Sequence, residues 1–150
     1  MDIDLEEWAS GAGPAIRDLI DGLGGDVEAF DAFPLSAVAV LDDLIIRMPW
    51  QEFENDDWIW IHSQLSAFVA VFLIHHFGGE WKAVPDPSAP GGWMPVIEVR
   101  GKNGLPHRVA PVELVHQELH PVPQRIPRLV ERATDLAGHG PLTNRLPHRP

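Results

Sequence analysis

The chain has 150 residues, a formal net charge of −11 and no cysteine. Without cysteine it can form no disulfide framework, no zinc–thiolate site and no thiol nucleophile, and its length predicts one domain. A chain this acidic is repelled by the phosphates of DNA and RNA, so nucleic-acid binding is disfavoured.

The N-terminal third of the chain is predicted to be helical and carries most of the charge. Apolar residues recur at helical spacing in residues 14–25, with Pro14 suited to the first turn, and again between Pro34 and Pro49. The start, MDIDLEEW, lacks the basic and apolar regions of a secretory signal. Together with the absence of cysteine, this favours a cytoplasmic location.

A long central helix is predicted over Trp58–Phe77, with Asn55 or Asp56 as its N-cap. Its second half is apolar on all sides, which indicates a buried helix. The uninterrupted apolar run Ala67–Ile74 is eight residues long, far short of the roughly 18–20 that span a bilayer, so we expect a core helix and no membrane segment. Four small residues on one face predict a closely packed neighbour: Ser63, Ser66, Ala67 and Ala70.

The stretch FLIHHFGGEWKAVP is predicted to end this helix and begin a sheet. Gly78 and Gly79 are suited to a C-cap, and Trp81 is expected to start a strand and fold back over the helix. His75 and His76 point about 100° apart on a helix, so they do not easily share one metal ion. We interpret them as imidazoles near the last carbonyls of the helix.

Three β-rich segments follow, Trp81–Val84, Met94–Arg100 and Leu105–Val109. The last two are separated by the turn sequence GKNG at 101–104, whose Asn-Gly pair favours positive φ and therefore a hairpin. The pattern predicts a three-stranded antiparallel sheet lying on the central helix.

The C-terminal part returns to helix. One helix is predicted between Pro111 and Pro121, and another over 122–138 whose core face includes Leu136. We therefore expect one α+β domain over residues 1–137 and a disordered tail over 138–150, which contains three prolines and no periodicity.

The segment ELVHQELH has the spacing of a possible metal site. Glu113, His116 and His120 stand at i, i+3 and i+7, and the two histidines form an i,i+4 pair that can chelate an ion. The residue after His116 is Gln117, so the zincin motif is absent. A solvated polar face is the competing interpretation, and we expect no cofactor.

A surface for a basic protein partner is suggested by charge and aromatic residues. The first 60 residues hold 15 Asp and Glu against 2 Arg, a net charge of −13. Complementary charge speeds and selects protein encounters, and tryptophan often anchors interfaces. The candidate partner-binding residues are Trp8, Asp42, Asp43, Trp50, Asp56, Asp57 and Trp93.

The run LSAFVAVFLIHHFGGEW, together with the preceding VAVLDDLI, resembles a group of small bacterial proteins of unknown function. In that group a helix with a Gly-x-x-x-Gly-Glu pattern ends in Gly-Gly-x-Trp before a β-hairpin. The resemblance covers about residues 34–120. Ser66 and Ala70 keep the small positions, but Val71 replaces the glutamate, which argues against chemistry at that position. In size, charge and lack of cysteine the chain is also similar to bacterial immunity-type proteins.

The function predicted first is therefore a non-enzymatic bacterial binding domain, an immunity- or adaptor-type protein with a basic protein partner. Two alternatives stay open: a metal-dependent enzyme using Glu113, His116 and His120, and a structural component of a phage or secretion apparatus. The oligomeric state is left open by the sequence.

Overall fold

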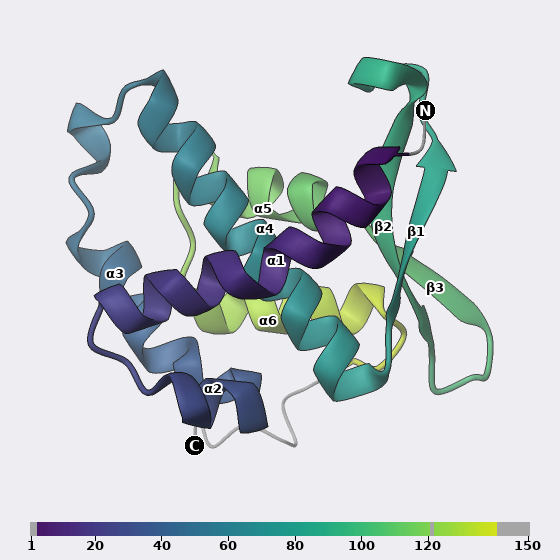
Figure 1. The fold of residues 1–150 in the computed structure, drawn as a ribbon, viewed down its shortest axis with the longest axis horizontal. Helices are drawn as coiled ribbons and strands as arrows, with labels where there is room; N and C mark the ends of the chain where they lie inside the picture. The colour runs from purple at the N-terminus through teal and green to yellow at the C-terminus, as the bar shows by residue number, and fades with distance from the viewer. Residues whose placement is uncertain (1–2, 121, 141–150) are drawn as a thin grey trace.

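The computed structural model describes residues 3–120 and 122–140 and shows an α+β fold, as predicted (Figure 1). Three N-terminal helices precede a long central helix, a three-stranded sheet and two C-terminal helices. The helices are α1 (Ile3–Gly22), α2 (Val27–Ala32), α3 (Val38–Arg47), α4 (Asn55–Phe77), α5 (Pro111–Leu119) and α6 (Ile126–Leu136). Short 3-10 turns lie at Pro34–Ala37, Trp50–Glu52 and Pro90–Gly92.

Helix α1 starts earlier than predicted and continues through Pro14, which was expected in its first turn. A proline inside a helix removes one backbone hydrogen bond. Here Pro14 is exposed, and the residues on either side of it form one continuous buried face, with Ala12 before it and Ile16 and Ile20 after it. Packing of that face against the rest of the molecule holds the helix together across the proline.

Helix α4 runs through the middle of the molecule, and most of its second half is buried (Figure 1). Its N-cap is Glu54, where Asn55 or Asp56 was predicted. The Glu54 and Asp57 side chains each accept a hydrogen bond from the other residue's backbone N–H, the reciprocal capping box. By length and composition alone α4 could cross a membrane, but half of its most apolar 18-residue window is buried inside the fold, as expected for a core helix.

The sheet has the predicted antiparallel topology, in the order β1-β2-β3. Its strands are β1 (Glu80–Pro85), β2 (Trp93–Arg100) and β3 (Pro106–Val109). In the central strand Ile97 lies opposite both Trp81 of β1 and Val109 of β3. Ile97 and Val99 are buried in the core that β2 shares with α4.

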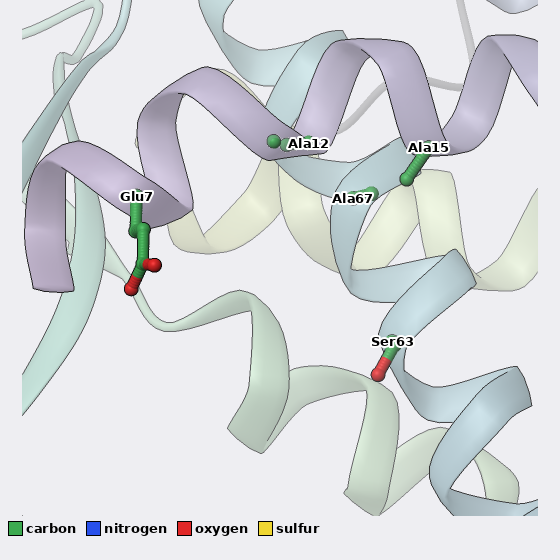
Figure 2. A pocket seen from close by; sticks show the side chains of 6 residues that line it. Glu7, Ala12, Ala15, Ser63 and Ala67 are labelled. Carbon is green, nitrogen blue, oxygen red and sulfur yellow. The ribbon is translucent and has the colours of Figure 1, made fainter.

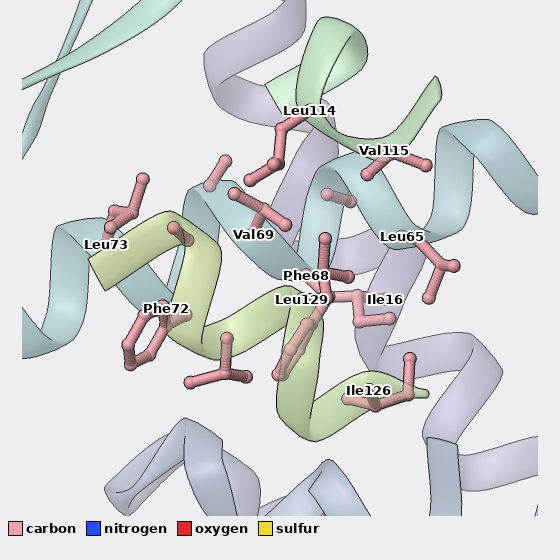
Figure 3. Packing of buried hydrophobic residues seen from close by; sticks show 14 of the residues in the cluster. Ile16, Leu65, Phe68, Val69, Phe72, Leu73, Leu114, Val115, Ile126 and Leu129 are labelled. Carbon is pink, nitrogen blue, oxygen red and sulfur yellow. The ribbon is translucent and has the colours of Figure 1, made fainter. Parts of the chain in front are cut away.

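The hydrophobic core lies around α4, where side chains of α1, α5 and α6 meet its apolar faces (Figure 3). Phe68 and Phe72 of α4 are among the largest fully buried side chains. On α6 the buried face is narrower than predicted. Leu136, assigned to the core from the sequence, is 39% exposed, and the small residues Ala133 and Ala137 are buried near that end of the helix.

The first residues after α6 pack against the sheet and α4. The His139 Nε2–H donates to the carbonyl oxygen of Arg100 at 2.7 Å, and its ring stacks on Phe77 with a centroid separation of 4.2 Å. The tail predicted to be disordered from residue 138 therefore has its first three residues placed in the fold. The rest of that prediction falls on residues 141–150, outside the described residues.

The two glycines after α4 have different roles and give a testable contrast. Gly78 is the C-cap with φ 71°, and a Cβ there would meet nothing within 4 Å. At Gly79 a Cβ would lie 2.5 Å from Ile97 Cγ2 and 3.2 Å from the carbonyl oxygen of Leu73. Helix end and sheet approach each other closely only because this residue has no side chain.

Gly79→Ala is expected to lower the free energy of unfolding by about 2–3 kcal/mol through overpacking. Gly78→Ala should cost about 1–2 kcal/mol, because alanine is disfavoured at positive φ. Urea unfolding measures both. Gly13→Ala is the control, since a Cβ at this half-buried helical position meets nothing within 4 Å. Equal losses at Gly79 and Gly13 would contradict the close approach.

Candidate metal centre

Three histidines from two helices meet on one side of α4. His62 comes from the second turn of α4, His116 from α5, and His120 from the position directly after α5. One ring nitrogen of each can be chosen so that all three lie within 4.8 Å of one another. The structure therefore gathers three imidazoles where the sequence alone offered an i,i+4 pair.

The position of His120 follows from the end of α5. Proline disfavours the helical conformation of the residue before it, and Pro121 follows His120 in the sequence. His120 accordingly leaves the helix with φ −128° and ψ 144°. Its ring still lies 4.7 Å from the ring of His116, measured between centroids. The rings of His116 and His120 thus stay close together although the helix ends before His120.

His62 closes the cluster from α4. Its Nε2 lies 3.2 Å from the Nε2 of His120, and its ring centroid is 5.6 Å from that of His116. Two nitrogens on a tetrahedral zinc ion, each about 2.0–2.1 Å from the metal, are about 3.3–3.4 Å apart. The separation of the His62 and His120 Nε2 atoms is therefore close to that of two zinc ligands, and at 3.2 Å it also fits a hydrogen bond between the two rings.

The electrostatics favour neutral imidazoles. Burial lowers the pKa of His62, and the nearby His120 and His116 lower it further. Burial also lowers the pKa of His120, with a second contribution from His116. Because a metal binds the lone pair of neutral imidazole, these two side chains are in the binding form at neutral pH.

An aromatic cluster forms one wall of the site. The ring of Trp58 lies 4.7 Å from His120 and 6.1 Å from His62, measured between centroids. Trp50 stacks on Trp58 at 5.4 Å, and Phe53 packs edge-on to it at 5.0 Å. The Trp50 indole N–H donates to the carbonyl oxygen of Ile45. Packing on this wall restricts the orientations of the two imidazoles.

The end of α5 is also tied to α6. Glu118 is buried, and its carboxylate accepts hydrogen bonds from Arg128 at 2.8 Å and Arg132 at 3.3 Å. Its backbone carbonyl accepts from the N–H of Gln124. These contacts fix the turn of α5 that comes directly before His120.

The predicted metal ligands are only partly brought together. His116 and His120 belong to the cluster, but Glu113 does not and is exposed on α5. His62 supplies the third ligand. Its place beside α5 was not predicted, because the spacing of histidines within one helix does not show which neighbouring helix His62 faces. A histidine four residues after Trp58, on the face bearing Leu65 and Val69, is the signal that could have placed it toward a neighbouring helix.

Several acids proposed for partner binding have partners inside the chain. Asp42 is buried and binds Arg125 and the backbone N–H of Ile126. Asp43 pairs with Arg47 on the same helix. Asp57, as described, caps α4, whereas Asp56 is exposed. Binding of a basic protein stays a prediction.

The predicted tryptophan anchors are divided between the core and the edge of the fold. Trp50 is half-buried in the aromatic wall, and Trp93 is half-buried at the start of β2. Trp81 packs against the core, as expected of the residue that starts the sheet. Trp8 lies on α1, and its side chain is outside the described part of the structure.

A separate hollow of about 320 Å³ lies between α1 and α4 (Figure 2). Its walls are mostly small side chains, which let the two helices approach closely. They are Glu7, Gly11, Ala12, Ala15, Ser63 and Ala67. The predicted small-residue stripe of α4 thus faces a neighbouring helix, and none of these residues belongs to the histidine cluster.

No family model, curated protein or solved structure matches this chain. The resemblance described from the sequence therefore stays a prediction, and the function is argued from the geometry of the site.

Proposed function

We propose that this protein binds one divalent transition-metal ion through His62, His116 and His120. The observation that carries the proposal is the convergence of three ring nitrogens, one from each histidine, within 4.8 Å. Two of these side chains come from positions 58 residues apart in the chain, and their Nε2 atoms are 3.2 Å apart. Neutral imidazoles at this separation are a ligand set that zinc accepts with small side-chain rotations.

The ligand type narrows the choice of ion. Imidazole nitrogens suit zinc, copper, nickel, cobalt and iron, whereas calcium and magnesium prefer oxygen ligands. Structural zinc sites close their coordination with four protein ligands, and catalytic ones keep three protein ligands and an open position. Three histidines therefore support an open centre, at which the ion can hold water or an exogenous donor and act as a Lewis acid.

This proposal modifies the metal-dependent alternative suggested by the sequence. The exposed Glu113 is replaced by His62 as third ligand, so the site joins α4 to α5 and no longer lies on one helix. Trp58 packs against His62 and His120, and Glu118 ties the end of α5 to α6. Both residues restrict the histidines without being ligands themselves.

The test is calorimetric titration of tag-free, chelator-treated protein with Zn²⁺ and Co²⁺. We expect one ion per chain and at least about a 100-fold loss of affinity in His62→Ala, because even residues that only orient ligands change affinity by about 10–100-fold. His75→Ala is the matched control, since His75 is an exposed histidine of the same helix. Circular dichroism verifies that both variants fold. Equal zinc affinity of His62→Ala and wild type would refute the site.

A further inference from the structure

From the surroundings of the histidine cluster, and on the basis of the metal site proposed above, we infer the class of ligand that occupies its open position. We propose that the metal binds the anionic head group of a small molecule whose apolar body lies on exposed hydrophobic side chains beside the histidines. The charge at the metal favours the anionic head group, and the exposed side chains around the metal favour the apolar body.

The charge determines the head group. The three imidazoles are uncharged when they bind a metal, so they leave the full charge of a divalent ion uncompensated. Among the residues that the structure describes, no carboxylate belongs to the ligand group. An anionic oxygen donor, such as a carboxylate or hydroxamate, supplies the missing negative charge and fills an open coordination position.

Exposed apolar side chains beside the histidines, here called the rim, favour an apolar body for the ligand. Ile59, 56% exposed, stands three residues before His62, and Val112, 37% exposed, stands four residues before His116. Side chains of a helix lean toward its N-terminus, so each imidazole leans over the turn that carries the apolar residue. Val122, 62% exposed, follows two residues after His120. Each metal ligand thus has an exposed large apolar neighbour close to it in the chain.

Trp58 extends the apolar surface inward. Its ring contacts the imidazoles of His62 and His120 and is itself half-buried. The structure leaves Val112 exposed, whereas Leu114 and Glu118 of the same helix are buried. Hydrophobic side chains around an open metal position favour a ligand that covers them, because apolar area removed from water stabilises the complex.

The experiment uses the full chain loaded with Co²⁺, whose visible spectrum reports a new ligand on the metal. Acetohydroxamate provides the head group alone, hexanohydroxamate adds four methylenes, and hexanamide provides the chain with a weak head group. We expect hexanohydroxamate to change the spectrum at concentrations at least about tenfold lower than acetohydroxamate, because part of its chain leaves water. Hexanamide should leave the spectrum unchanged.

The double variant Ile59→Ser/Val112→Ser separates the rim from the metal. It should bind Co²⁺ and acetohydroxamate as the wild type does but lose the preference for the longer chain. Leu105→Ser is the matched control, because Leu105 is a large apolar residue 60% exposed that lies in the β2–β3 hairpin. It should keep the preference.

The outcomes distinguish the two proposals. If Co²⁺ binds but the two hydroxamates act at equal concentrations, or neither changes the spectrum, the ligand class is wrong and the metal site stands. If the double variant keeps the full preference, the rim is elsewhere and the inference fails. If Co²⁺ does not bind to the wild type, both proposals fall.

Discussion

Asp42→Ala is expected to lower the free energy of unfolding by about 2–3 kcal/mol. The buried carboxylate of Asp42 accepts a hydrogen bond from the N–H of Ile126 at 2.9 Å, in the first turn of α6. No side chain of α6 caps its own N-terminus, so a residue of α3 provides the cap. Losing a cap costs about 1 kcal/mol, and leaving a buried donor unsatisfied adds about 1–3 kcal/mol.

Arg125 adds a second contact to the same carboxylate, with its Nε 2.8 Å from both oxygens of Asp42. Its side chain is largely exposed, so solvent screens this pair and most of the expected loss comes from the cap. Urea unfolding at neutral pH measures the change. Asp43→Ala is the control, because its i,i+4 pair with Arg47 is exposed and contributes no more than about 0.5 kcal/mol. Equal losses for the two aspartates would contradict the remote cap.

The same contact has a defined pH dependence. Burial alone would raise the pKa of Asp42, but the hydrogen bonds from Arg125 and Ile126 and the charge of Arg125 together lower it. The folded state therefore binds this proton less readily than the unfolded chain, so the contribution of Asp42 is present above the ordinary aspartate pKa and is lost in acid. The stability difference between wild type and Asp42→Ala should narrow as the pH falls below about 4.

Local patterns predicted most of the secondary structure. The Asn-Gly turn marked the β2–β3 hairpin, the apolar run marked the buried half of α4, and Gly78 marked its end. These features depend on residues close together in sequence. The path of α1 through Pro14 does not, because its continuity depends on burying Ala12 and Ile16 against distant elements. Local propensity therefore placed that helix start eleven residues too late.

Only part of the candidate site could be predicted from the sequence, because only contacts between residues close together in the chain follow from local patterns. The i,i+4 spacing of His116 and His120 is local, and it survived even though α5 ends before His120. Choosing between Glu113 and His62 as third ligand requires the register of α4 against α5. Asp42 is a similar case, since its partner Arg125 is 83 residues away and nothing near it distinguished a cap from a surface acid.

Zinc is expected to stabilise the folded protein by about 4 kcal/mol when free Zn²⁺ is about 1,000 times its dissociation constant. The ligands His62, His116 and His120 are gathered only in the folded state, so the ion binds the unfolded chain far more weakly. For a domain of this size, about 4 kcal/mol corresponds to a rise in Tm of about 8–15 °C. At the same zinc concentration, an affinity loss of at least about 100-fold in His62→Ala should reduce the rise to about a third or less, whereas His75→Ala should keep it.

Lowering the pH should remove the stabilisation of the folded protein by zinc. Burial and the neighbouring histidines lower the pKa of His62 and His120, so the folded apo-protein binds fewer protons than the unfolded chain. Its stability is therefore complete above the ordinary histidine pKa and falls as the pH drops through about 6.5. Protons also compete with zinc for the same lone pairs, so the Tm difference with and without zinc should be large at pH 7.5 and small at pH 5. A zinc-induced rise of equal size at both pH values would place the ion on carboxylates, because these stay ionised at pH 5, and would exclude the three histidines as its ligands.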